Sequence, residues 1–396
     1  MEAIRTFVAT HEKEMFGLLH DLVEMQTGTD NKAGIDRMVS FLDGYLSSRG
    51  LRTRVVEQKD AGNILTAEFP CAGDTPRRIL LSGHMDTVFP EDTTFRHLCC
   101  EGDVAHGPGT CDMKGGLVVG IFAMLALLEQ GFGRTMPVRF LFSPDEERSS
   151  RTMRAFLREE AARAAFALVF EMAGPENELV RTRKGKVAFR VRIRGRAGHA
   201  AFITRGKVSA LLDAARKIEL LEAMNTSEVR GEGSLSVNVG RLSGGVAFNV
   251  VPEEAFLDVE SRCNTVRQME EVSERIRKIL LEPQVEGTST EILETVTSPP
   301  LEAGATAALY ALAAEAAAEL GQQTGEECRP GCSEASFLAR EGVPVLDGLG
   351  PRGGKDHSTE EFLLLSSLRE RTELTALLLC KAWERWKSGS RLLPEA

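Results

Sequence analysis

The sequence has neither the charge pattern of a nucleic-acid-binding protein nor an apolar run long enough to cross a membrane. Its 48 Lys and Arg residues are outnumbered by 58 Asp and Glu residues, giving a formal net charge of -10, and the basic residues form no blocks. This balance argues against nucleic acid or an anionic membrane as the main partner. The longest uncharged apolar stretch, Gly115–Leu128, has 14 residues. That is too short for a bilayer and predicts a buried core helix.

Paired cysteines and a targeting segment are also missing. The eight cysteines are scattered, with no Cys-x-x-Cys pair or other metal-type spacing. In a chain of 396 residues this indicates reduced thiols rather than a disulfide framework. Residues 1–25 are broken by charges and contain no apolar core or small-residue cleavage site, so we expect no targeting signal. A cytoplasmic location is the expectation that follows.

Most of the chain has the pattern of an α/β domain. Up to about residue 182, strand-like segments alternate with helical ones, which predicts a largely parallel sheet. Helices are expected at 3–25, 35–46, 115–128 and 150–163, and strands at 51–56, 63–69, 78–82, 138–143 and 166–170. The α/β pattern continues towards the end of the chain, with helices expected at 305–321 and 362–387 and a strand near 344–346.

Residues 183–296 have the pattern of a sheet with one face exposed to solvent. In Lys186–Arg194, apolar side chains alternate strictly with Lys and Arg. Further strands at 234–241 and 255–262, with helices at 208–224 and 269–281, complete a β-α-β-β-α-β (ferredoxin-like) α+β unit. We therefore expect a small domain, residues 183–296, inserted into a larger domain made of residues 1–182 and 297–396.

Acidic residues and histidines gather at the ends of the expected strands, where α/β sheets place their sites. His84 and Asp86 follow the strand at 78–82. A neutral imidazole is a good zinc ligand, and a nearby carboxylate can hold its other N–H, although such a pair alone is more often a polar turn. Asp112 lies in a glycine-rich turn before the helix at 115–128, where it could instead cap that helix.

Three adjacent carboxylates, Asp145, Glu146 and Glu147, follow the strand at 138–143. They repel one another unless a cation lies among them. Consecutive side chains of an extended chain point apart, so Glu147 could bind a metal while Glu146 faces a water molecule. A solvated acidic loop is the alternative.

Two further candidates come from other parts of the chain. Glu171 follows the strand at 166–170, and His357 lies in a glycine-rich loop before the last helix. Each alone fits an ordinary exposed position. With His84, Asp112 and Glu147, however, they supply two imidazoles and three carboxylates, a set that suits two divalent ions sharing one bridging carboxylate.

The order of these motifs resembles that of the M20 zinc peptidases, which include glutamate carboxypeptidase and amide-bond deacylases. The resemblance covers nearly the whole chain. It is carried by six segments: 83–88 (GHMDTV), 109–116 (GTCDMKGG), 145–147 (DEE), 170–175 (FEMAGP), 195–200 (GRAGHA) and 355–361 (KDHSTEE).

The resemblance implies a metal-binding role for each of the five candidate ligands. His84 and Glu171 would hold one zinc ion, Glu147 and His357 would hold the other, and Asp112 would bridge the two. Aminopeptidases of this family carry Asp where this chain has Glu171, so the residue favours a carboxypeptidase or a deacylase.

The resemblance also implies residues that act on the substrate. Asp86 would orient the histidine of the first zinc ion, and Glu146 would be the general base. The inserted domain would serve as a lid and dimerisation domain, from which His199 reaches the active site of the partner subunit and stabilises the oxyanion. Arg262 would bind the substrate carboxylate, and Asn249 is also implied as a substrate contact.

We therefore expect a homodimeric di-zinc hydrolase of the glutamate carboxypeptidase type. It would cleave a peptide or amide bond next to a free carboxylate in a short peptide or N-acyl amino acid, and Co²⁺ or Mn²⁺ fits the same ligands. An N-acyl-amino-acid deacylase of the acetylornithine or succinyl-diaminopimelate type remains open, because it shares every catalytic residue. A catalytically silent metal-binding dimeric scaffold is a third possibility, but such proteins usually lack the base or a ligand.

Overall fold

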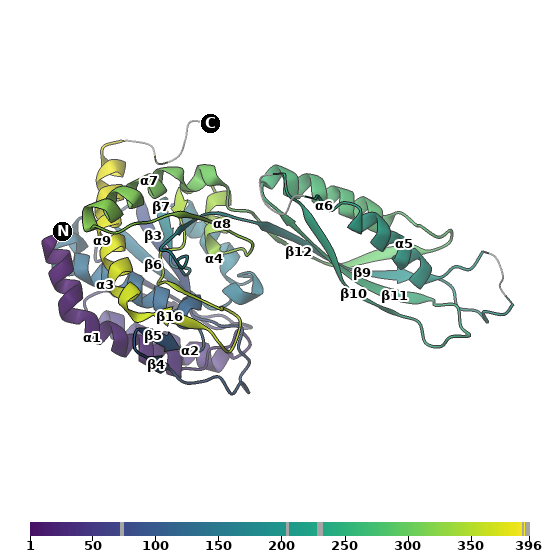
Figure 1. Ribbon diagram of the computed structural model, residues 1–396, viewed down its shortest axis with the longest axis horizontal. Coiled ribbons are helices and arrows are strands. Elements are labelled where there is room, and N and C mark those ends of the chain that lie inside the picture. Colours follow the sequence, from purple (N-terminus) through teal and green to yellow (C-terminus); the bar gives the residue numbers. More distant parts are fainter. Residues whose placement is uncertain (72–74, 203–205, 228–232, 390–391, 393–396) are drawn as a thin grey trace. The chain divides into compact units, whose positions relative to one another are not determined.

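The chain folds into two compact units (Figure 1). The computed structural model describes residues 1–71, 75–202, 206–227, 233–389 and 392. The first unit consists of Met1–Thr182, Glu302–Cys328 and Ser333–Ala396, and the second of Arg183–Leu301 and Arg329–Cys332. The chain leaves the second unit after residue 301, whereas the sequence analysis placed this boundary at 296. Strand β12 (Ser289–Ser298) continues past that point, and Leu301 pairs with Arg183 at the base of the unit.

The first unit contains most of the helices and strands. Its helices are α1 (Glu2–Glu24), α2 (Lys32–Ser47), α3 (Gly115–Glu129), α4 (Met153–Ala161), α7 (Ala303–Leu320), α8 (Glu334–Arg340) and α9 (Leu365–Lys387). Its strands are β1 (Arg52–Val56), β2 (Ile64–Glu68), β3 (Arg78–His84), β4 (Cys99–Glu101), β5 (Val104–His106), β6 (Val138–Ser143), β7 (Ala164–Val169), β14 (Val345–Leu346), β15 (Gly353–Gly354) and β16 (Phe362–Leu364). Strands β8 (Leu179–Arg183) and β13 (Glu326–Arg329) pair with each other, and each belongs to the first unit except for its last residue.

The main sheet has six strands in the order β1-β2-β6-β3-β7-β14. The pairs β6–β3, β3–β7 and β7–β14 are parallel, whereas β1–β2 and β2–β6 are antiparallel. The expected α/β fold is therefore confirmed, with a sheet that is mixed. Because β6, β3 and β7 are parallel neighbours, their carboxyl ends meet at one edge of the sheet.

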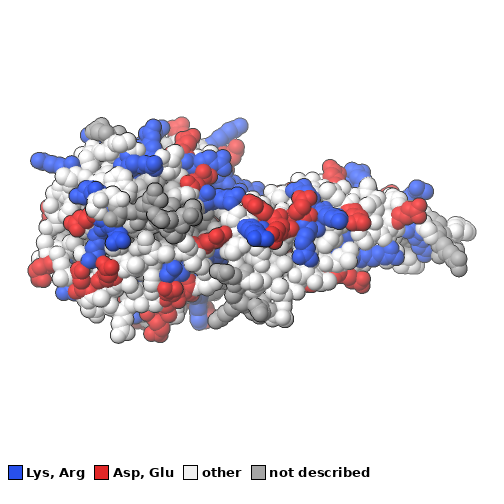
Figure 2. All heavy atoms as spheres, turned by 90° about the horizontal axis from the view of Figure 1, so that it is seen from above, with Lys and Arg blue, Asp and Glu red and all other residues white. Residues whose placement is uncertain are grey.

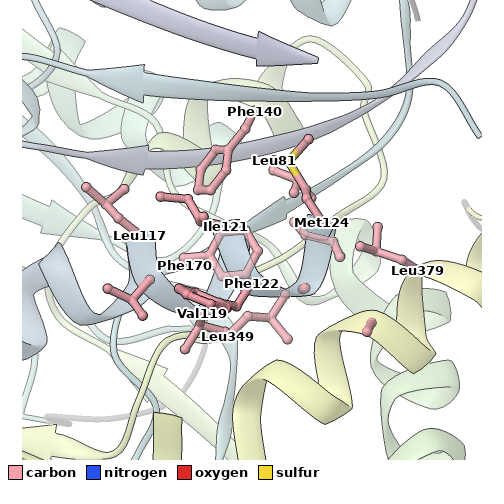
Figure 3. Close-up of a cluster of buried hydrophobic side chains, with 14 of the residues drawn as sticks. Leu81, Leu117, Val119, Ile121, Phe122, Met124, Phe140, Phe170, Leu349 and Leu379 are labelled. Atoms are coloured by element: carbon pink, nitrogen blue, oxygen red, sulfur yellow. The ribbon is translucent and has the colours of Figure 1, made fainter. Parts of the chain in front are cut away.

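Helix α3 forms the centre of the core of this unit (Figure 3). It packs against β3 and against helices α1 and α9, and it is apolar on all sides, as a fully enclosed helix must be. The stretch Thr110–Glu129 is long and apolar enough to cross a membrane by length and composition, but 89% of its most apolar window is buried inside the protein. The expectation of a buried core helix at this position is confirmed.

The second unit is built on one antiparallel sheet, ordered β10-β11-β9-β12. Its elements follow one another as β9 (Gly185–Arg194), α5 (Ala210–Glu222), β10 (Ser236–Gly244), β11 (Glu254–Cys263), α6 (Val266–Leu281) and β12. The apolar residues of β9 are buried together with those of β11 and both helices. On the other face, Arg190 pairs with Asp258 at 3.1 Å and with Glu294 at 3.3 Å. On the face of the molecule displayed in Figure 2, basic and acidic side chains are interspersed.

The helix expected at 362–387 begins three residues later than predicted. Phe362–Leu364 instead forms β16, which pairs with β5 so that Phe362 lies opposite His106. This pairing partner lies more than two hundred residues away in the sequence, so the local pattern alone could not reveal it. The small sheet β15-β16-β5-β4 borders the turn that precedes α3.

Candidate metal centre

The five candidate ligands lie where strands of the first unit end. His84 is the last residue of β3, Glu147 lies in the turn after β6, and Glu171 follows β7. Asp112 lies in the turn Thr110–Lys114 before α3, and His357 lies in the segment between β15 and β16. The parallel pairing of β6, β3 and β7 brings the first three together.

Asp112 lies between the two histidines. Its Oδ1 is 3.0 Å from Nε2 of His84, and its Oδ2 is 3.3 Å from Nε2 of His357. Nε2 of His84 also lies 3.7 Å from Oε1 of Glu171, and Nε2 of His357 lies 3.2 Å from Oε2 of Glu147. One carboxylate thus faces both imidazoles, and each imidazole faces one further carboxylate.

Among the described residues, three groups of His, Asp and Glu side chains have ligand atoms that lie within 4.8 Å of one another. These groups are His84–Asp112–Glu147, His84–Glu146–Glu171 and Asp112–Asp356–His357. Together they include all five candidate ligands. They also contain Glu146, which was expected to act as the base, and Asp356, for which no role was expected. Imidazole nitrogens and carboxylate oxygens are a suitable donor set for zinc or a similar divalent ion.

Most of the charged side chains at this site are buried, so their negative charges have to be neutralised. His84, Asp112 and Glu171 are buried, whereas His357 is exposed and opens the site to solvent. Several carboxylates in a confined space are unfavourable unless cations or protons neutralise them. The side chains present therefore fit divalent cations.

The pKa values of these groups reflect the same crowding. Burial and the negative charge of Glu171 raise the pKa of Glu146 well above its usual value, and burial with the charge of Asp112 raises that of Glu147 to about 7. Hydrogen bonds to Asp112 and Glu147 raise the pKa of His357 to about 11. When no cation is bound, protons therefore occupy much of the site.

The pKa of His84 is also raised well above its usual value. Burial opposes a charge on this ring, but hydrogen bonding to Asp112 and Asp86 outweighs burial. Nδ1 of His84 lies 2.9 Å from the backbone oxygen of Asp86 and 3.4 Å from the Asp86 carboxylate. With the Nδ1 proton held in this way, Nε2 faces the candidate ligands, which is the usual arrangement for a metal-binding histidine.

The Asp86 carboxylate makes its closest contacts elsewhere. Its two oxygens accept the backbone N–H groups of Glu146 at 3.1 Å and Glu147 at 3.2 Å. The Thr29 hydroxyl donates a third hydrogen bond at 2.7 Å. Asp86 thus holds the Glu146–Glu147 turn through its side chain and His84 mainly through its backbone. Thr29 was not predicted from the sequence, because no motif marks it.

The remaining candidates belong to the second unit. His199 and Asn249 are exposed and lie side by side, since His199 pairs with Val250 and the backbone oxygen of Asn249 accepts the Ala200 N–H at 2.9 Å. Nδ1 of His199 accepts the N–H of Ala201 at 3.2 Å, so the neutral ring carries its proton on Nε2. His199 can therefore donate a hydrogen bond through Nε2.

Arg262 lies at the opposite end of the same sheet. It precedes the last residue of β11, and its guanidinium contacts Glu260 at 2.7 Å and the Pro330 backbone oxygen at 3.3 Å. The strand begins at Glu254, close to the loop of Asn249. At 3.3 Å per residue, the length of β11 separates the two ends by roughly 25 Å.

Comparison with known proteins gives a family match, a similar sequence and similar structures. A profile of the peptidase family M20/M25/M40 matches residues 80–381. Carboxypeptidase G2 of Pseudomonas sp. (strain RS-16) is 28% identical over 371 residues, which cover 91% of this chain and 87% of that protein. An M20 family metallo-carboxypeptidase from Sulfolobus solfataricus has a similar structure, with a TM-score of 0.72 and 16% identity over 92% of this chain and 98% of that one.

A further structural match is a dinuclear metal-binding peptidase of the M20 family from Bacillus subtilis. It has a TM-score of 0.66 and 17% identity over 95% of this chain and 99% of that one. The two structural matches show that the fold is shared.

Proposed function

This chain belongs to the peptidase family M20/M25/M40 and is a hydrolase, and we propose that it is a two-metal carboxypeptidase. It would cleave the peptide or amide bond next to a free carboxylate in a short peptide or N-acyl amino acid. The similarity to carboxypeptidase G2 along 91% of the chain supports a carboxypeptidase-like activity.

The placement of Asp112 is the observation that carries this proposal. Its two oxygens face two different imidazoles at 3.0 and 3.3 Å. We propose that His84 and Glu171 hold one ion, that Glu147 and His357 hold the other, and that Asp112 holds both. We propose zinc as the native metal, and Co²⁺ or Mn²⁺ would suit the same donors.

The bound ions would polarise the substrate carbonyl and acidify the attacking water. Glu146 would accept the proton of that water, and the position of its carboxylate within 4.8 Å of the ligand atoms of His84 and Glu171 supports this role. Its backbone N–H is held by Asp86 at 3.1 Å, which restricts where the side chain can reach. Glu146 would then return the proton to the leaving nitrogen.

The second unit would contribute the contacts to the substrate. We propose that Arg262 pairs with the free carboxylate, with Asn249 as a further contact. His199 would donate its Nε2 proton to the charge that develops on the carbonyl oxygen.

The distance between these residues supports a homodimer. His199 and Arg262 lie at opposite ends of one sheet, separated by roughly 25 Å, so a small substrate could not touch both residues of a single chain. If both contact the same substrate, one must come from a neighbouring subunit. Three strongly exposed apolar side chains, Phe202, Val246 and Phe248, lie in the loops that carry His199 and Asn249, as is common where proteins associate. We also propose a cytoplasmic location, on sequence grounds alone.

A metal analysis followed by a substrate panel tests the proposal. Purified protein should contain about two divalent ions per chain, and a chain that binds none would contradict the proposal. A chain that binds metal but hydrolyses no substrate of the panel would support the silent metal-binding scaffold. Metal-loaded enzyme is then given dipeptides and N-acyl amino acids, each paired with its carboxamide. We expect hydrolysis of the free acids and at least a tenfold lower kcat/KM for the carboxamides, which lack the recognised charge. Equal rates would contradict carboxylate recognition, and a preference for N-acyl amino acids over dipeptides would favour the deacylase.

A further inference from the structure

Glu361 is a buried carboxylate to which the function proposed above assigns no role. It lies four residues after His357 and is 1% exposed. Oε2 accepts the backbone N–H of Gly109 at 2.9 Å. Oε1 accepts the N–H groups of Cys111 at 2.9 Å and Asp112 at 3.1 Å. One side chain thus binds three backbone amides of the turn that carries Asp112.

This turn needs such a partner. Within Thr110–Lys114, Asp112 has φ -118° and ψ 88°, and Met113 has φ -136° and ψ 35°, neither of which is helical. The turn opens a helix, and the first N–H groups of a helix have no carbonyl partner within it. A carboxyl group, with two oxygens and no N–H group of its own, can accept several of these hydrogen bonds at once.

Glu361 is itself firmly held. Its backbone N–H donates to the Ser358 oxygen at 3.2 Å, and its backbone oxygen is 3.2 Å from Nδ1 of His106. Strand β16 begins at the next residue and pairs with β5. At the far end of the turn, Nζ of Lys114 donates to the Met25 oxygen at 2.9 Å. The turn is therefore anchored on both sides of Asp112.

We propose that Glu361 is a positioning residue of the metal centre, which keeps Asp112 between the two imidazoles. The inference rests on the proposed role of Asp112 as the shared ligand. Glu361 and His357 lie on one short segment, and Asp112 lies 3.3 Å from His357. Glu361 therefore ties together the two parts of the chain that supply these ligands.

The substitution Glu361→Gln tests the carboxylate at almost unchanged volume. A glutamine offers one acceptor oxygen, and its NH₂ group would face at least one backbone N–H. The turn would lose one or two of its three hydrogen bonds. Glu360→Gln is the matched control, because the neighbouring Glu360 is exposed and pairs only with Lys355 at 3.0 Å among the described residues.

Zinc affinity of the metal-free proteins is the decisive measurement. Zinc is titrated into wild type and both variants against a chromophoric chelator, and thermal unfolding of the metal-free forms is recorded separately. We expect Glu361→Gln to bind at least one zinc ion about 10- to 100-fold more weakly, and Glu360→Gln to match wild type. Activity of Glu361→Gln should recover partly as the zinc concentration is raised.

The outcomes separate this inference from the proposed function. If wild type binds no zinc, the proposed function fails. If wild type binds two ions and folded Glu361→Gln binds them equally tightly, the positioning role is refuted, whatever the melting temperature. Should Glu361→Gln not fold, Glu361→Asp keeps the charge on a shorter side chain, and unchanged zinc affinity in that variant would refute the role as well.

Discussion

Binding of two zinc ions to the metal-free protein should release about two to three protons at pH 7. Imidazoles bind metal only in the neutral form. The raised pKa values of His84 and His357 mean that both rings carry an extra proton at this pH, and metal must displace it. Glu147, with a pKa of about 7, is about half protonated and contributes about half a proton more.

The sign of the pH dependence follows from these protons. Since binding releases protons, zinc affinity should rise with pH. Around pH 7 the logarithm of the overall affinity for two ions should increase by about two to three per pH unit. The slope of this plot against pH should decrease above pH 7, because Glu147 then loses its proton before metal binds. It should decrease further as the pH approaches about 11, the pKa of His357.

Calorimetry can count the protons directly. Zinc is titrated into metal-free protein at pH 7 in buffers of different ionisation enthalpy, and the slope of the observed heat against that enthalpy gives the number released. The variant His357→Ala should release fewer protons, because it lacks one imidazolium. Release of less than one proton by wild type would refute the reasoning, since the donors could not then be the protonated groups described above.

Three further predictions concern individual residues. Glu146→Gln should keep both metal ions and lose about 10²–10⁴-fold in kcat; more than a tenth of wild-type kcat with normal metal content would show that Glu146 is not the base. Asp112→Ala should lose both tightly bound ions, whereas His357→Ala should mainly weaken one, and metal titration decides between these outcomes. His199→Ala should lose about 10²–10³-fold in kcat at normal metal content. Tagged mixed dimers of His199→Ala with Glu146→Gln should regain activity if His199 serves the neighbouring site, and inactive mixed dimers would argue against this.

The longer elements could be predicted because their own residues decide them. Strand β6 has the expected bounds, Val138–Ser143, and α3 ends one residue beyond the expected Leu128. Both segments are so apolar that they are stable only when buried, and this requirement can be read from their own residues. The short strands β4, β5, β15 and β16 were not predicted, because two or three residues carry no periodic pattern. Their conformation depends on partners such as His106 and Phe362, which are distant in the sequence.

For the site, the sequence by itself determined the kinds of donor and their places at the ends of strands. Imidazoles and carboxylates that follow apolar strands can be read directly from the residue order, and so can the family. Which donors meet was decided only by the tertiary structure. Asp112 divides its oxygens between His84 and His357, Asp86 holds the turn of the acidic pair, and Glu361 binds the amides of the Asp112 turn. These contacts join residues that are tens to hundreds of positions apart, and their distances are set by the packing of strands and helices rather than by any local preference of the chain.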